Sequence, residues 1–108
     1  MANIFRIIGS IFKKKKPLDY VTYEVSGTPS GFNVTYTEES KQTVQNPDVP
    51  DGWKYSYKGK PGDYFYFSAQ SNNKNAAVNV KIYQHGEVLK EASDSGDFVL
   101  ATVSGRLM

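Results

Sequence analysis

Few side chains in this sequence could take part in catalysis or hold a metal ion. His85 is the only histidine, and the chain has no cysteine. A disulfide framework, a thiolate nucleophile and a sulfur-ligated metal are therefore all excluded. Histidine and glycine both tolerate left-handed turns, so His85 and Gly86 are predicted to form a two-residue hairpin turn between strands.

The carboxylates are scattered rather than paired. Asp48, Asp51, Asp63, Asp94 and Asp97 lie in segments of turn composition, where aspartate commonly accepts hydrogen bonds from nearby backbone. Acid–base or nucleophilic catalysis needs a positioned partner for each group, and the sequence shows no carboxylate pair, phosphate-binding glycine loop or Ser-His-Asp arrangement. We therefore expect no catalytic residue, no metal ion and no cofactor, and hence a protein that is not an enzyme.

A different kind of chemistry, attraction to a surface, is concentrated in a leader formed by residues 1–17. On a helix, its apolar side chains fall on one stripe and Arg6 falls opposite them. About ten helical residues span roughly 15 Å, half of a hydrocarbon core, so this amphipathic helix can lie on a bilayer without crossing it. The predicted contact residues are Ile4, Phe5, Ile8, Ile11, Phe12, Lys13, Lys14, Lys15 and Lys16.

The leader needs a partner, because a helix of about three turns is marginal in water. One candidate is an anionic membrane surface or a membrane protein complex, which would make this a peripheral protein at the cytoplasmic face of a membrane. A signal peptide carries its charges before its apolar stretch, whereas here the lysines follow it, so we expect neither a signal peptide nor a transmembrane helix. The alternatives are that the leader packs on its own domain, that it joins copies into a homo-oligomer, or that it is disordered.

Charge is divided unevenly along the chain. The leader holds five basic residues and no acid, a net of +5, whereas residues 18–108 hold 8 bases and 11 acids, a net of −3. A surface that binds nucleic acid needs clustered lysine and arginine. We therefore expect no nucleic-acid partner for the domain.

Residues 18–108 are predicted to form one all-β domain, a seven-stranded antiparallel β-sandwich. Short runs of alternating apolar and polar residues, separated by turn residues, indicate strands with one buried and one solvated face. Lys41–Gln45 is a further candidate strand, and Asn46–Gly52, which contains two prolines, is predicted to be a loop. The seven predicted strands are Tyr20–Ser26, Phe32–Glu38, Trp53–Lys58, Tyr64–Gln70, Ala76–Gln84, Glu87–Ser93 and Phe98–Ser104.

Several tyrosines fall on strand faces that point away from the predicted core. Tyr64 and Tyr66 alternate with the core residues Phe65 and Phe67, and Tyr83 shares its face with polar residues. Exposed rings of this kind stack on sugars or anchor a protein partner, and they also form cross-strand pairs that stiffen a solvated sheet. The three tyrosines are the predicted ligand or partner face, and a carbohydrate-binding module is one alternative function.

Seven short blocks after Pro17 agree in order and spacing with a known family. They are VTYEVSG at 21–27, VTY at 34–36, WK at 53–54, SAQ at 68–70, VKIY at 80–83, GEVLKEA at 86–92 and ATVSG at 101–105. Together they resemble the soluble domain of MmpS, the small mycobacterial membrane proteins, over nearly all of the chain after Pro17. The resemblance implies an immunoglobulin-like or transthyretin-like sandwich that helps an RND-type transporter to export lipids or siderophores.

The resemblance brings no catalytic residue, and the chain departs from the family in two respects. The family's tether is a membrane-spanning helix, whereas the leader is too short to span, and the cysteines of some members are absent. The predicted function is therefore a non-catalytic binding or accessory domain, attached peripherally to a membrane by the leader and belonging to a membrane transport complex. The alternative is a soluble protein–protein interaction module.

Overall fold

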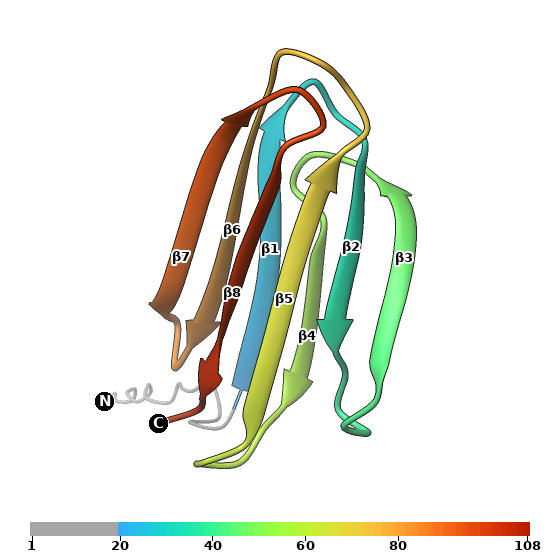
Figure 1. Ribbon diagram of the computed structural model, residues 1–108. Coiled ribbons are helices and arrows are strands. Elements are labelled where there is room, and N and C mark those ends of the chain that lie inside the picture. The colour runs from blue at the N-terminus through green and yellow to red at the C-terminus, as the bar shows by residue number, and fades with distance from the viewer. Residues whose placement is uncertain (1–19) are drawn as a thin grey trace, which may run out of the picture.

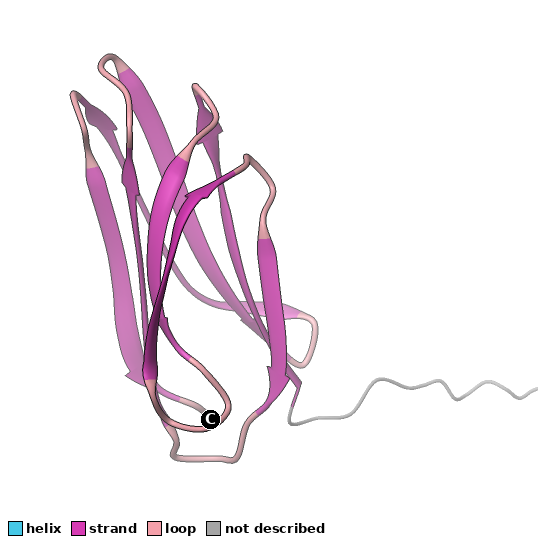
Figure 2. Ribbon diagram, turned by 90° about the vertical axis from the view of Figure 1, so that its right-hand side faces the viewer, coloured by secondary structure: helices cyan, strands magenta, loops and turns pink. Residues whose placement is uncertain are grey.

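A computed structural model describes residues 20–108, which form an all-β structure of two stacked antiparallel sheets. Sheet A has the strand order β4-β1-β6-β7 and sheet B the order β3-β2-β5-β8 (Figure 1). Figure 2 shows the two layers from the side. The strands are β1 (Tyr20–Thr28), β2 (Phe32–Thr37), β3 (Thr43–Val49), β4 (Lys54–Lys58), β5 (Tyr64–Ser71), β6 (Ala76–Gln84), β7 (Glu87–Gly96) and β8 (Leu100–Arg106).

The described residues contain eight strands where the sequence predicted seven. The prediction of a loop over Asn46–Gly52 is wrong for its first half, because β3 continues to Val49. Proline is tolerated at sheet edges and bulges, where its missing N–H is not needed. β3 is an edge strand, and its register with β2 shifts between Phe32 and Val34, where Pro47 lies. The backbone N–H that Pro47 lacks is therefore missing at a point where the β2–β3 hydrogen-bond ladder is already interrupted. The predicted leader helix lies outside the described residues.

The core lies between the sheets and is formed by alternate residues of each strand. In β1, Val21, Tyr23 and Val25 are fully buried, whereas Thr22 and Glu24 on the other face are partly exposed. The other inward positions predicted from the alternation also belong to this core or pack against it, which confirms the pattern. Burying one such apolar side chain contributes about 1.5–3 kcal/mol.

The β6–β7 connection confirms one predicted turn, and the β7–β8 connection corrects another. His85 and Gly86 form the hairpin turn with φ of 60° and 78°, as a two-residue turn requires. The turn predicted at Asp94–Asp97 begins later, because β6, which is 9 residues long, continues to pair with β7 up to Gly96. β8 correspondingly starts at Leu100.

A buried tyrosine hydroxyl links the two sheets. The Tyr23 ring, from sheet A, stacks on Phe67 of sheet B with ring centroids 5.1 Å apart. Its hydroxyl donates to the backbone carbonyl of Thr37 at 2.7 Å and lies 3.1 Å from the Tyr57 hydroxyl. Because Tyr23 has a single proton, Tyr57 is the donor in the second bond. Burial raises the pKa of Tyr23 and keeps it neutral.

A lysine connects the sheets at one side. β7 and β8 belong to different sheets but lie side by side (Figure 1). Lys90 of β7 donates from Nζ to the backbone carbonyl of Ser104 in β8 at 2.8 Å. β8 is an edge strand, so this bond satisfies an acceptor on the open edge of sheet B.

Candidate functional site

The predicted site residues fall into three places. The leader residues lie outside the described part of the chain. Tyr64 and Tyr66 lie on the outer face of sheet B, paired with Arg106 and Ser104 of β8. Tyr83 lies on the outer face of sheet A, opposite Thr22 of β1. The sequence prediction had placed the three tyrosines together, and the structure separates Tyr83 from the other two.

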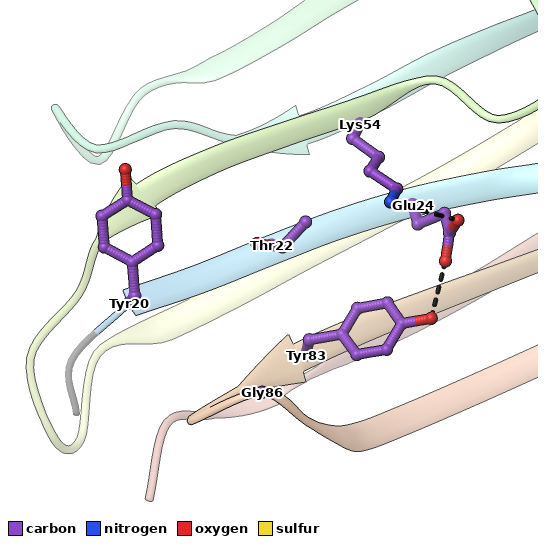
Figure 3. A pocket seen from close by; sticks show the side chains of 6 residues that line it. All are labelled: Tyr20, Thr22, Glu24, Lys54, Tyr83 and Gly86. Atoms are coloured by element: carbon purple, nitrogen blue, oxygen red, sulfur yellow. Dashed lines mark hydrogen bonds and ion pairs between the residues drawn. The ribbon is translucent and has the colours of Figure 1, made fainter. Parts of the chain in front are cut away.

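The sheet A pocket is a hollow on the outer face of that sheet, next to the start of β1. Tyr20, Thr22 and Glu24 point outward from alternate positions of β1, and the β1–β6 register brings Tyr83 beside them. Figure 3 shows the rings of Tyr20 and Tyr83 on either side of Thr22, with Glu24 at the far end. The pocket has a volume of about 300 Å³ and is lined by Tyr20, Thr22, Glu24, Lys54, Tyr83 and Gly86.

Hydrogen bonding and charge hold the far end of this pocket in place. The Tyr83 hydroxyl donates to Oε1 of Glu24 at 2.6 Å. Oε2 of the same carboxylate lies 3.9 Å from Nζ of Lys54, and the two side chains are 21% and 61% exposed. The bond to Glu24, together with partial burial, raises the pKa of Tyr83 to about 12. The phenol therefore stays protonated and orients the carboxylate.

The sheet B groove is a second hollow, on the opposite outer face. It has a volume of about 400 Å³, and its lining carries amide, hydroxyl and apolar groups but no charge. The Asn33 side chain is held in place, because its Oδ1 accepts hydrogen bonds from the backbone of Asp48 and from Asn72. The lining residues are Asn33, Val34, Thr35, Gln45, Asn46, Pro47, Gln70 and Leu100.

The two ends of the domain differ in charge. The leader-side end is the one where β1 starts at Tyr20, and the far end holds the β1–β2, β3–β4, β5–β6 and β7–β8 connections (Figure 1). The leader-side end balances four bases against four acids, Lys41, Lys58, Lys60 and Arg106 against Glu38, Glu39, Asp63 and Glu87. The far end has four aspartates against one lysine, a net of −3, from Asp48, Asp51, Asp94, Asp97 and Lys74.

Ion pairing at the leader-side end involves one aspartate. Asp63 accepts hydrogen bonds from the backbone of Lys60 at 3.0 Å and from Lys41 Nζ at 3.2 Å. The Lys60 backbone bond, followed by Lys41, lowers the pKa of Asp63. This carboxylate is therefore a structural group that joins two turns.

The structure also shows where His85 lies and how the acidic side chains of residues 20–108 are spaced. His85 is exposed in its hairpin turn, and within residues 20–108 no three His, Asp or Glu side chains cluster closely enough to hold a metal ion. In the same range no helix is long and apolar enough to span a membrane. No family model matches the chain, and no curated protein matches it either.

The sequence prediction missed the sheet A pocket as a unit. The alternation in β1 already placed Tyr20, Thr22 and Glu24 on one outward face, and a hairpin explains the closeness of Gly86 to β6. The pairing of β1 with both β4 and β6 is non-local, however, and no short-range pattern specifies it. That pairing is what brings Lys54 and Tyr83 to the same carboxylate.

Proposed function

We propose that this chain is a non-catalytic binding domain that the leader holds on an anionic membrane surface. The observation that carries this proposal is the direction of charge in the molecule. The leader, with a charge of +5, joins the domain at the end where β1 starts, and the acidic loops with a net of −3 lie at the opposite end of the domain. An anionic surface attracts the first and repels the second, so the domain stands with its far end away from the lipid.

The energies are large enough for reversible attachment. Each basic residue near an anionic leaflet contributes about 1 kcal/mol, and each apolar side chain that inserts fully adds about 1.5–3 kcal/mol. The apolar leader residues, such as Phe5, Ile8 and Phe12, supply the second term. The leader thus provides both of the signals that stable peripheral binding requires.

The resemblance to MmpS extends the proposal to a setting. Two stacked antiparallel sheets agree with the immunoglobulin-like or transthyretin-like sandwich that the resemblance implies. We therefore propose that the domain is an accessory of a membrane transport complex, and we infer from the order of apolar and basic residues in the leader that it lies at the cytoplasmic face. In this setting the outer faces of the two sheets are the surfaces that bind the transport complex.

Vesicle co-sedimentation tests the attachment. Exchanging Lys15 and Lys16 for glutamine should weaken binding to vesicles that contain phosphatidylserine by roughly thirtyfold, from two lost contributions of about 1 kcal/mol. The matched control replaces Lys74 and Lys81 of the domain with glutamine. It lowers the net charge by the same amount and should leave vesicle binding nearly unchanged. Equal loss in both variants would contradict the proposed orientation.

Co-sedimentation also distinguishes membrane attachment from the alternative, a soluble interaction module whose leader packs on its own domain or joins two copies. A chain that begins at Leu18 should no longer bind vesicles if the leader contacts lipid, while its melting temperature and the number of chains per particle in solution stay the same. A lower melting temperature or fewer chains per particle, with vesicle binding unchanged, would instead assign the leader to its own domain or to a second copy.

A carbohydrate-binding module is the second candidate function, and the uncharged lining of the sheet B groove favours it. Tyr64 is 50% exposed there, and Tyr66 lies two residues along the same strand from it. Amide and hydroxyl groups of the sheet B groove continue this face. A glycan array with the Tyr64→Ala, Tyr66→Ala double variant tests this function, because loss of a glycan signal in the variant would support it.

A further inference from the structure

The sheet A pocket combines two aromatic walls with a hydrogen-bonding end. Tyr20 and Tyr83 supply rings on either side of Thr22, and Glu24 and Lys54 lie beyond them (Figure 3). Aromatic rings offer apolar surface to the C–H faces of a ligand, and the few polar groups of a pocket set its orientation. A ligand for this pocket therefore has one apolar face and a hydrogen-bonding edge.

The distance between the Glu24 carboxylate and the Lys54 ammonium group indicates which chemical group the hydrogen-bonding edge of the ligand carries. Oε2 of Glu24 and Nζ of Lys54 are 3.9 Å apart, beyond the usual range of a direct hydrogen bond. A ligand hydroxyl beside them can lie about 2.8 Å from both atoms, donating to the carboxylate and accepting from the ammonium group. The Tyr83 hydroxyl donates to Oε1, so Oε2, beside Lys54, is the carboxylate oxygen that we assign to the ligand.

Charges of both signs surround the pocket. The strand registers place Lys54 and Lys81 on either side of Glu24, and Lys58 opposite Tyr20. A cationic ligand would approach three lysines, and an anionic ligand would meet the carboxylate at the hydrogen-bonding end. A ligand rich in hydroxyl groups carries no charge and satisfies the donor and the acceptor together.

We propose that the sheet A pocket binds one polyhydroxylated six-membered ring, such as a pyranose or an inositol. The inference deepens the proposed binding role and rests on it, because it names the ligand class of the membrane-attached domain. The volume of about 300 Å³ lies at the small end of ligand pockets and suits a single ring. The ring can come from a free saccharide or from the head group of a lipid.

Amide shift mapping of the full chain with methyl pyranosides and myo-inositol tests the site. Binding should shift the signals of Thr22, Glu24 and Tyr83 and leave those of Tyr64 and Tyr66 unchanged. Glu24→Gln should weaken the interaction roughly tenfold or more, because it removes a charge-assisted acceptor. Tyr64→Ala is the matched control on the other sheet and should bind normally. Shifts confined to sheet B, or none with any ring, would overturn the proposal.

Vesicles distinguish the two sources of the ring and keep the leader's role separate. If the ring is a lipid head group, adding phosphatidylinositol or a glycolipid to phosphatidylserine vesicles should strengthen binding of the full chain, and Glu24→Gln should abolish only that increment. If the ring is a free saccharide, the methyl pyranosides should bind without any such increment. Normal binding to phosphatidylserine with no ring bound in either experiment would leave the attachment standing and sink the pocket proposal.

Discussion

The outer faces of the two sheets share a fold and differ in chemistry. The outer face of sheet A carries ionised groups around its pocket, Glu24 between Lys54 and Lys81, whereas the sheet B groove is lined only by uncharged residues. The inward residues are constrained by a common core, but the outward residues are free to differ. The comparison teaches that the chemistry of the two outer faces is set by residues that folding does not dictate.

The largest expected effect separates the inner from the outer face of one strand. Phe67 is fully buried, and its neighbour Tyr66 on β5 points outward. Phe67→Ala should lower the free energy of unfolding by about 3–5 kcal/mol through lost burial and a cavity. Tyr66→Ala should cost about 1 kcal/mol or less. Urea denaturation measures both losses in the free energy of unfolding. Equal losses would contradict the distinction between the constrained inner face and the free outer face of β5.

An intermediate effect is expected at the hydroxyl that links the sheets. Tyr23→Phe leaves the buried carbonyl of Thr37 without that donor and should cost about 1–3 kcal/mol. Tyr57→Phe is the control, because it removes only the donor to Tyr23 and should cost less. Thermal unfolding checks the order, and a larger loss for Tyr57→Phe would reverse the assigned hydrogen-bond directions.

The smallest effect on stability, and the sharpest test of sheet A, concerns pH. The bond to Glu24 raises the pKa of Tyr83 to about 12, so its stabilisation is fully present below the ordinary tyrosine pKa near 10 and is lost as pH rises through about 12. Glu24→Gln should move the Tyr83 pKa toward about 10. Carbon-13 NMR titration of the tyrosine rings measures this shift, and Thr35→Val in sheet B should leave it unchanged.

Local patterns were sufficient to predict the strands and the core. The alternation in β1 and β6 predicted one buried face on each strand, where Val21, Tyr23 and Ile82 lie, and the His85–Gly86 pair located a hairpin. Such signals depend on residues that are close in sequence. The candidate strand at Lys41–Gln45 found the first half of β3, but its second half was missed, because the tolerance of Pro47 depends on an edge position and a register shift that only the assembled sheet defines.

The candidate pocket was less predictable than the fold, for a related reason. Tyr83 was chosen as an exposed ring, but its bond to Glu24 spans 59 positions of the chain. The partner of an outward side chain is set by strand order, and many strand orders are compatible with the same alternation. The sheet order β4-β1-β6-β7 is therefore the information that the sequence patterns lacked.

The bond from Lys90 to Ser104 bears on how copies of this chain behave when they are crowded together. Open strand edges are templates on which further strands add and fibrils grow. A strand that adds to β8 would have to displace the Lys90 ammonium group or bury its charge, which is costly. A strand that adds to β3 would meet the irregular backbone at Pro47. Both devices oppose polymerisation, so concentrated solutions of this protein should stay dispersed.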